Sequence, residues 1–139
     1  DAGTVAARAT YAAASIVFAR QFPAPTRGPT VRYNRQQHYG GSQTNSPVAR
    51  AARAAGEGQA CPTCNQIQVS GTRTAPSPQH EPTLVEHYYD YGGYTLTDAQ
   101  RRVYARTQGI NGTQCITCQR QEGAAASRYS REQARINGL

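Results

Sequence analysis

The chain has 139 residues, of which only 37% are hydrophobic, with 13 Gly and 8 Pro, so we expect one domain whose small core needs a staple such as a metal. No apolar run reaches the roughly 18 residues that a transmembrane helix needs, so no membrane-spanning helix is expected. All 15 cationic residues are Arg, and the net charge of +7 favours a polyanionic or an acidic protein partner.

The N-terminal third, residues 1–43, is expected to be a helix followed by an arm or linker. An Ala-rich stripe predicts the helix between residues 4 and 22, with helical spacing of Val5, Ala9, Ala12, Ile16 and Ala19. The run Pro23-Ala24-Pro25 ends it, and residues 26–47 are polar and Gly-rich like a loop. The start at Asp1 lacks both Met and a signal-peptide pattern, which suggests a fragment of a longer polypeptide or an artificial end.

Short elements are predicted on both sides of the first Cys pair. Ser46 is a suitable N-cap for a helix that has Pro47 at its first position and ends near residue 55. Residues 61–64 are expected to form a knuckle. The alternation at 67–69 predicts a strand, and residues 72–78 are expected to be extended.

The C-terminal half predicts three helices. They span Thr83 to Tyr91, Thr97 to about Thr107, and the stretch after Cys118 to about Ile136. The pair Gly92-Gly93 separates the first two helices, and Asn111-Gly112 is expected to be a turn.

The four cysteines of the chain form two C-x-x-C pairs, Cys61 with Cys64 and Cys115 with Cys118. Each pair points two thiolates at one spot, and two such turns supply the four ligands of a tetrahedral zinc. Because four thiolates leave no open position on the ion, the expected role of the metal is structural. Cross-paired disulfides in an exported protein and a redox-active pair are the alternatives.

His80 lies between the two Cys pairs and is the first candidate for a general base. The ordinary pKa of a His is close to neutral pH, so such a ring can take a proton from water. Glu86 and His87 lie on the helix expected from Thr83, from which one of them can turn towards His80. Glu86 can hold a hard divalent cation through oxygen. An exposed His and a solvated helix face are the plain alternatives for these residues.

Arginines on the last expected helix are candidates for nucleic-acid contacts. Arg at this spacing can follow phosphates, and the N–H groups at a helix start attract phosphate. The candidates, which include one Arg from an earlier segment, are Arg73, Arg120, Ser127, Arg128 and Arg131. An ordinary solvated charged helix is the alternative interpretation of the same pattern.

Three parts of the chain together resemble a known nuclease family. They are Cys61-Pro62-Thr63-Cys64, then Gln79-His80 leading into Leu84-Val85-Glu86-His87-Tyr88-Tyr89, and then Gln114-Cys115-Ile116-Thr117-Cys118 with Gln121-Glu122-Gly123-Ala124 and Ser127-Arg128-Tyr129-Ser130. In order and spacing, residues 44–139 resemble the HNH/endonuclease VII superfamily of His-Me finger nucleases, which are toxin domains of bacterial polymorphic toxins such as Rhs-type and type VI effectors. The resemblance implies an α+β fold, a small treble-clef or ββα-metal core clamped by a four-cysteine zinc site, with an N-terminal helix and irregular arm.

The resemblance also implies roles for single residues. His80 matches the family's water-activating His, and Gln119 stands where related nucleases place an Asn that holds the catalytic Mg²⁺ or another divalent cation. The family usually has Asp where this chain has Gln79, and an amide is a weaker magnesium ligand than a carboxylate. A charge supplied by Glu81, Glu86 or Glu122, a weakened or inactive variant, and a different placement of the motif are three explanations; we favour the first.

These observations lead us to expect a metal-dependent endonuclease toxin that hydrolyses DNA without strong sequence specificity. Its expected partners are DNA, a cognate immunity protein, and the parent secreted effector polypeptide that delivers it to the cytoplasm of a target bacterial cell. No membrane partner is expected. A non-catalytic zinc-stabilised module that binds nucleic acid is the main alternative, and a disulfide-stapled secreted interaction domain is the third.

Overall fold

The computed structural model describes residues 28–41 and 45–139, so the helix expected between residues 4 and 22 lies outside the described ranges. The described elements are α2 (Arg35–Tyr39), α3 (Pro47–Gly56), β1 (Pro76–His80), α4 (Leu84–Asp90), the 3-10 helix η1 (Gly93–Thr95), α5 (Asp98–Arg106), β2 (Ile110–Cys115) and α6 (Ile116–Ile136). Helices and a two-stranded sheet confirm the expected α+β class. Among the described helices, none combines the length and the apolar character needed to cross a membrane.

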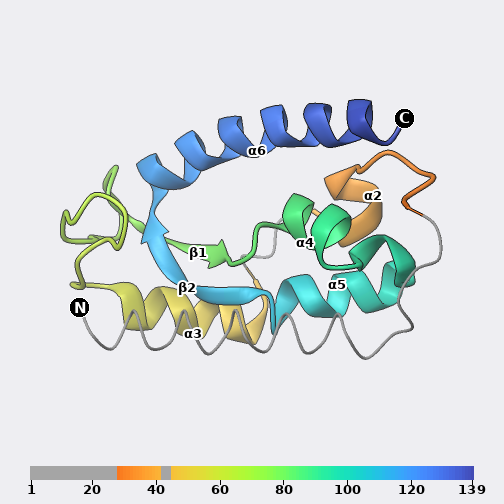
Figure 1. Ribbon diagram of the computed structural model, residues 1–139. Helices are drawn as coiled ribbons and strands as arrows, with labels where there is room; N and C mark the ends of the chain where they lie inside the picture. The colour runs from red at the N-terminus through yellow and green to blue at the C-terminus, as the bar shows by residue number, and fades with distance from the viewer. Residues whose placement is uncertain (1–27, 42–44) are drawn as a thin grey trace.

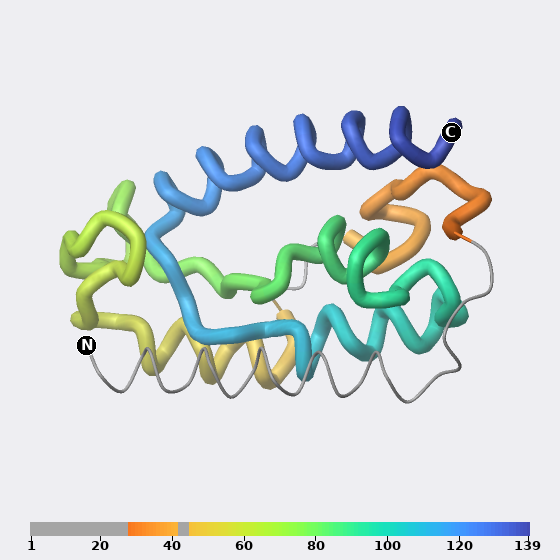
Figure 2. The backbone as a smooth tube through the Cα atoms, in the orientation of Figure 1, coloured from red at the N-terminus to blue at the C-terminus, as the bar shows by residue number. Residues whose placement is uncertain are grey.

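The two strands lie in the middle of the described fold, between α3 on one side and α6 on the other (Figure 1). The helices α2, α4 and α5 gather at one end of the fold, which we call the aromatic end for the residues described below. The backbone path in Figure 2 shows residues 57–75 at the opposite end, which we call the cysteine end. The long helix α6 runs from the cysteine end to the aromatic end, so it connects the two.

The helices begin where the sequence supplies caps. The Ser46 hydroxyl accepts a hydrogen bond from the N–H of Ala49 at 3.1 Å, and Pro47 is the first residue of α3. α4 and α5 each begin with a capping box, formed by Thr83 with Glu86 and by Thr97 with Gln100. The helix after Ser46 and the three helices predicted in the C-terminal half are therefore confirmed.

β1 and β2 pair in antiparallel fashion, but their register is irregular. Between the Pro78–Thr113 pair and the His80–Ile110 pair, β1 advances by two residues and β2 by three, so β2 carries a bulge. Gly112 has a φ of 68°, in the left-handed region that glycine adopts without steric cost. The turn predicted at Asn111-Gly112 is therefore wrong, because the positive φ at this Gly allows a bulge within a strand.

The main core lies at the aromatic end. Its buried side chains are Tyr39, Leu84, Val85, Tyr88, Tyr89, Tyr104 and Ala105. Residues before α2 are bonded to this core, since the N–H of Tyr33 donates to the Tyr89 hydroxyl at 3.1 Å and the Tyr88 hydroxyl donates to the Val31 carbonyl at 2.6 Å. The loop expected over residues 26–47 thus contains a helix, and residues 28–41 pack with the rest of the described chain.

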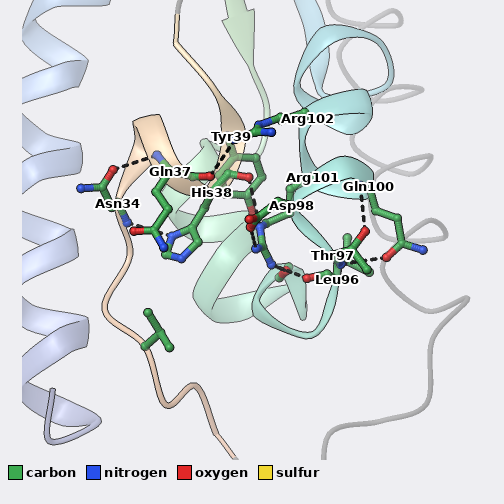
Figure 3. A network of polar contacts seen from close by, with 12 residues as sticks. Asn34, Gln37, His38, Tyr39, Leu96, Thr97, Asp98, Gln100, Arg101 and Arg102 are labelled. Carbon is green, nitrogen blue, oxygen red and sulfur yellow. Dashed lines mark hydrogen bonds and ion pairs between the residues drawn. The ribbon is translucent and has the colours of Figure 1, made fainter.

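Arg101 connects α2 to α5 and to η1, as Figure 3 shows. Its buried guanidinium donates to the His38 carbonyl at 3.1 Å and to the Gly93 carbonyl at 3.0 Å, and it also bonds the Leu96 carbonyl and the Asp98 carboxylate. A buried cation is costly unless its donors are satisfied, and these oxygens take four of the five N–H groups. The bond to His38 holds α2, which is too short to form by helix propensity alone.

Candidate functional site

The four cysteine sulfurs come together at the cysteine end. All four Sγ atoms lie within 4.8 Å of one another, and those of Cys64 and Cys115 are 3.8 Å apart. A tetrahedral zinc with Zn–S bonds of about 2.3 Å places its sulfurs about 3.8 Å apart, whereas a disulfide needs about 2.05 Å. All four cysteines are free, so the cluster is compatible with a structural metal such as zinc.

The backbone positions these sulfurs from two sides. The N–H of Asn65 donates to the Cys61 carbonyl at 2.8 Å and closes the expected knuckle. The strand predicted at 67–69 is reduced to a single bridge between Ala60 and Ile67. On the other side, Cys115 ends β2 and Cys118 lies in the first turn of α6, so the strand-to-helix junction carries the second pair.

The hydrogen bonds within the cluster favour a bound cation. Burial opposes ionisation of Cys61, but the N–H groups of Cys115, Cys64 and Thr63 outweigh it and lower the pKa of this thiol to about 6. Burial, followed by the neighbouring sulfurs, raises the pKa of Cys118. Four thiolates this close repel one another, so a divalent cation is needed for all of them to be ionised together.

A cavity of about 380 Å³ lies between the end of β1, the start of α4 and one face of α6. Its polar lining consists of Arg35, Gln79, His80, Thr83, Gln119, Glu122, Ser127 and Ser130. In a regular strand, consecutive side chains point to opposite faces. Gln79 and His80 are consecutive and yet line the same cavity, which is consistent with the bulge opposite them.

The His80 ring is fixed by one backbone bond. Its Nε2 lies 2.8 Å from the Ala105 carbonyl oxygen, which can only accept, so Nε2 carries the proton of the neutral ring and Nδ1 carries the lone pair. Nδ1 forms no hydrogen bond with a described residue. Burial, the largest cause, lowers the pKa of His80 to about 4; the bond to Ala105 acts against this, and the Arg35 charge adds to it. The ring is therefore neutral at pH 7.

Oxygen atoms suited to a hard cation lie beside His80. Gln79, Gln119 and Glu122 all line the cavity, and the Gln79 Oε1 atom is buried without a hydrogen bond to any described residue. A buried carbonyl oxygen without a partner is costly, and a cation is one group that can satisfy it. These three side chains therefore fit a divalent cation by the chemistry of their donors.

Glu86 and His87 do not line this cavity. The Glu86 carboxylate accepts from the Thr83 N–H at 3.2 Å and from its hydroxyl at 2.7 Å, so it caps α4. His87 is fully buried in the aromatic core, where its ring stacks on Tyr104 at 3.7 Å between centroids and its Nδ1 lies 2.6 Å from the Tyr39 hydroxyl. Both residues therefore have partners outside the cavity, although His87 lies close enough to His80 for the charge of His80 to lower the pKa of His87.

The arginines expected to bind nucleic acid are exposed. Arg120, Arg128 and Arg131 lie on α6, on a face about a third of a turn away from the cavity lining. Ser127 lies on the cavity lining itself. Arg73 is in the loop of the cysteine end, where its carbonyl accepts from the Thr117 hydroxyl at 2.7 Å.

Sequence reasoning missed two residues, one that lines the cavity and one that is bonded to three of its lining side chains. Arg35, from the segment expected to be an arm, lines the cavity, and its side chain forms no hydrogen bond or ion pair with a described residue. Gln114 is 1% exposed and bonds four other polar side chains. The spacing of Gln119, Glu122 and Ser127 on one helix face could have indicated the α6 wall, but no local signal marks the other two.

Comparisons with known proteins gave no match: no family model, no curated protein and no solved structure is significantly similar to this chain. A functional assignment therefore depends on the chemistry of the cavity and of the cysteine cluster.

Proposed function

We propose that this chain is a divalent-cation-dependent endonuclease domain that hydrolyses DNA phosphodiester bonds, with His80 as the general base. The observation that carries the proposal is which nitrogen of the neutral His80 ring bears the proton. Its Nε2–H is bonded to the Ala105 carbonyl, so the lone pair is on Nδ1, and the ring lines a cavity with oxygen ligands and an arginine.

In the proposed reaction, Nδ1 of His80 takes a proton from the attacking water. The Ala105 carbonyl holds the ring in place and stabilises the imidazolium that forms, because a hydrogen bond to the charged form favours it. An anionic phosphodiester beside the ring favours the charged form as well. Substrate binding therefore raises the pKa of His80 from about 4 towards the neutral range in which a general base is most effective.

Gln79, Gln119 and Glu122 are the residues that would hold the divalent cation. Such a cation, Mg²⁺ in the simplest case, supplies Lewis-acid stabilisation of the pentacovalent phosphate and the leaving oxygen. Glu122 is the carboxylate that compensates for Gln79, where the resembled family has Asp. Of the three carboxylates considered from the sequence, it is the one on the cavity wall, since Glu86 caps α4.

Arg35 is suited to bind a non-bridging oxygen of the same phosphate, because its guanidinium offers donors that no described residue uses. The exposed arginines of α6 can hold neighbouring phosphates and give binding that weakens steeply with salt. A nuclease of the treble-clef or His-Me finger type agrees with the order knuckle, β1, β2 and α6, with α4 and α5 inserted between the strands.

The test is plasmid cleavage in Mg²⁺ by wild type and His80→Ala at equal zinc content. Loss of a general base is expected to reduce the rate about 10²- to 10⁴-fold, while circular dichroism and zinc content stay unchanged. Gln121→Ala, at an exposed α6 position outside the cavity, is the control and is expected to cleave normally. Mg²⁺ is omitted rather than chelated, because a chelator also removes an ion from the cysteines. Normal cleavage by His80→Ala would remove His80 from the mechanism.

The second candidate is a non-catalytic module that binds nucleic acid, which the exposed arginine face of α6 favours. Such a module retards plasmid in a gel without shortening it, in Mg²⁺ as well as without it. The same gel therefore separates the two functions.

The biological setting we propose is that of a toxin domain, carried by a secreted effector polypeptide into the cytoplasm of a target cell. A DNA-cutting domain must be silenced in its producer, and the net charge of +7 suits an acidic immunity protein. Co-expression with the product of the adjacent reading frame, followed by co-purification, tests this partner.

A further inference from the structure

One buried amide connects the cysteine end to the cavity. The Oε1 atom of Gln114 accepts from the Thr63 hydroxyl at 2.8 Å and from Nε2 of Gln79 at 3.3 Å. The Nε2 atom of Gln114 donates to the Glu122 carboxylate and, at 3.5 Å, to Oε1 of Gln119. Thr63 lies within the knuckle, and the other three partners are side chains of the cavity wall.

The charge of Glu122 determines how these amides are oriented. A carboxylate can only accept, so the NH₂ group of Gln114 must face Glu122 and its oxygen must face the other way. The Gln114 oxygen can only accept and would repel another oxygen, so Gln79 presents its NH₂ group to it. The Gln79 oxygen is thereby directed away from Gln114, and it is buried with no hydrogen-bond partner in the described part of the chain.

We propose that Gln114 is a positioning residue for the cation site. The Gln114 NH₂ group faces Glu122, so the Gln114 oxygen faces Gln79 and accepts from its NH₂ group. The Gln79 oxygen, rather than its NH₂ group, is then offered to the cation. This inference rests on the proposed function, because it assigns a task to the same cavity. An NH₂ group in that place would repel a cation, so an amide at position 79 can serve as a ligand only if its orientation is fixed.

The test measures Mn²⁺ binding to the zinc-loaded chain, with electron paramagnetic resonance to count free Mn²⁺. Gln114→Met keeps the approximate length of the side chain but removes its polarity. We expect it to weaken Mn²⁺ binding about tenfold or more, as loss of groups that orient metal ligands commonly does, at one zinc per chain. Gln121→Met makes the same change at an exposed α6 amide and is expected to bind like wild type.

The double variant Gln79→Glu with Gln114→Met distinguishes orientation from structure. A carboxylate offers an oxygen in either orientation, so it no longer needs Gln114, and we expect Mn²⁺ affinity to return to the wild-type level or above. Gln79→Glu alone is the reference, because a carboxylate binds Mn²⁺ more tightly than an amide in any case. A purely structural role of Gln114 predicts that the double variant still binds about tenfold more weakly than Gln79→Glu, whereas an orienting role predicts equal affinities. Wild-type affinity in Gln114→Met, weaker binding by the double variant than by Gln79→Glu, or absence of Mn²⁺ binding to wild type would each overturn the proposal.

Two further variants keep the inference separate from the reaction and from folding. His80→Ala is expected to bind Mn²⁺ as wild type does, so its cleavage tests the proposed function independently of the cation site. If Gln114→Met does not fold, Gln79→Met tests the ligand directly. Unchanged Mn²⁺ affinity in Gln79→Met contradicts the inference, and a loss of about tenfold supports it.

Discussion

His80 and His87 are seven residues apart, both are buried, and they are close enough for the charge of His80 to lower the pKa of His87, but one ring faces the region of the cavity and the other the region of the aromatic core. His80 lines the cavity, with one nitrogen bonded to a backbone carbonyl and the other without a hydrogen bond to a described residue. His87 is enclosed at the aromatic end, stacked on Tyr104 and bonded to Tyr39. Burial lowers both pKa values, to about 4 and about 3. A lowered pKa alone therefore does not identify a catalytic His; the cavity beside it does.

The largest effect is expected from a variant of the cysteine cluster, which should unfold both regions if the cluster holds a structural metal. Structural zinc contributes about 10 kcal/mol or more to the folding of small zinc domains, and the core here is small. Cys115→Ser is expected to yield a chain without zinc and with little helical circular dichroism. A Cys115→Ser chain that keeps its helices and its cleavage would contradict a structural role for the cluster.

The next effect separates the two histidines. His87→Ala removes a stacked core ring and is expected to lower the free energy of unfolding by about 2–4 kcal/mol. His80→Ala loses one backbone bond and is expected to cost about 1 kcal/mol. Urea unfolding measures both, and cleavage per folded molecule should fall for His80→Ala alone. Equal effects on stability and cleavage would mean that the two regions do not differ as described.

A smaller effect is expected from Gly93→Ala, which acts on the aromatic end only. A Cβ at this position would contact the Tyr39 hydroxyl and lie 2.7 Å from Nδ1 of His87 and 2.8 Å from its carbonyl oxygen. Such overpacking costs about 1–3 kcal/mol. Thermal unfolding is expected to shift down, while Mn²⁺ binding and cleavage at low temperature stay normal.

The last effect, which is small at neutral pH and grows only in acid, is a pH dependence of stability. The pKa of His87 is about 3 when folded and about 6.5 when unfolded, so the unfolded chain binds more protons between these values. The contribution of His87 is complete above pH 6.5 and is lost as pH falls towards 3, at about 1.4 kcal/mol per pH unit. His87→Phe should therefore flatten the dependence of unfolding free energy on pH between 6.5 and 4 by about this slope. An unchanged slope would contradict the lowered pKa.

Local signals predicted the helices and the cysteine cluster well. Ser46, Thr83 and Thr97 lie at helix starts because their hydroxyls cap N–H groups within the next three residues, which needs no tertiary information. The two C-x-x-C pairs predicted one cluster, and their sulfurs are gathered as expected. His80 was expected to be a candidate base, and its place on the cavity wall agrees with that hypothesis without testing the reaction.

Features that depend on tertiary contacts could not be predicted. Residues 35–39 have no apolar repeat, and bonds from Arg101 and others hold them as a helix. Asn111-Gly112 has the composition of a turn, but pairing with β1 makes it part of a strand. Gln114 acquires its role only when Thr63, Gln79 and Glu122 meet around it. The prediction that Glu86 holds a cation could have been avoided from the sequence, because Thr83-x-x-Glu86 is the pattern of a capping box.

Cys118 and Gln119 are neighbours on α6. The place of the Cys118 sulfur in the cluster therefore also fixes which side chains of this 21-residue helix face the cavity. One residue inserted between them would leave every cysteine in the chain but rotate all later side chains by about 100°. Gln119 would then take the exposed place of Arg120, and Gln121 would stand on the cavity wall where Glu122 is now. The length of α6 can therefore vary at its C-terminal end, whereas Gln119 must directly follow Cys118.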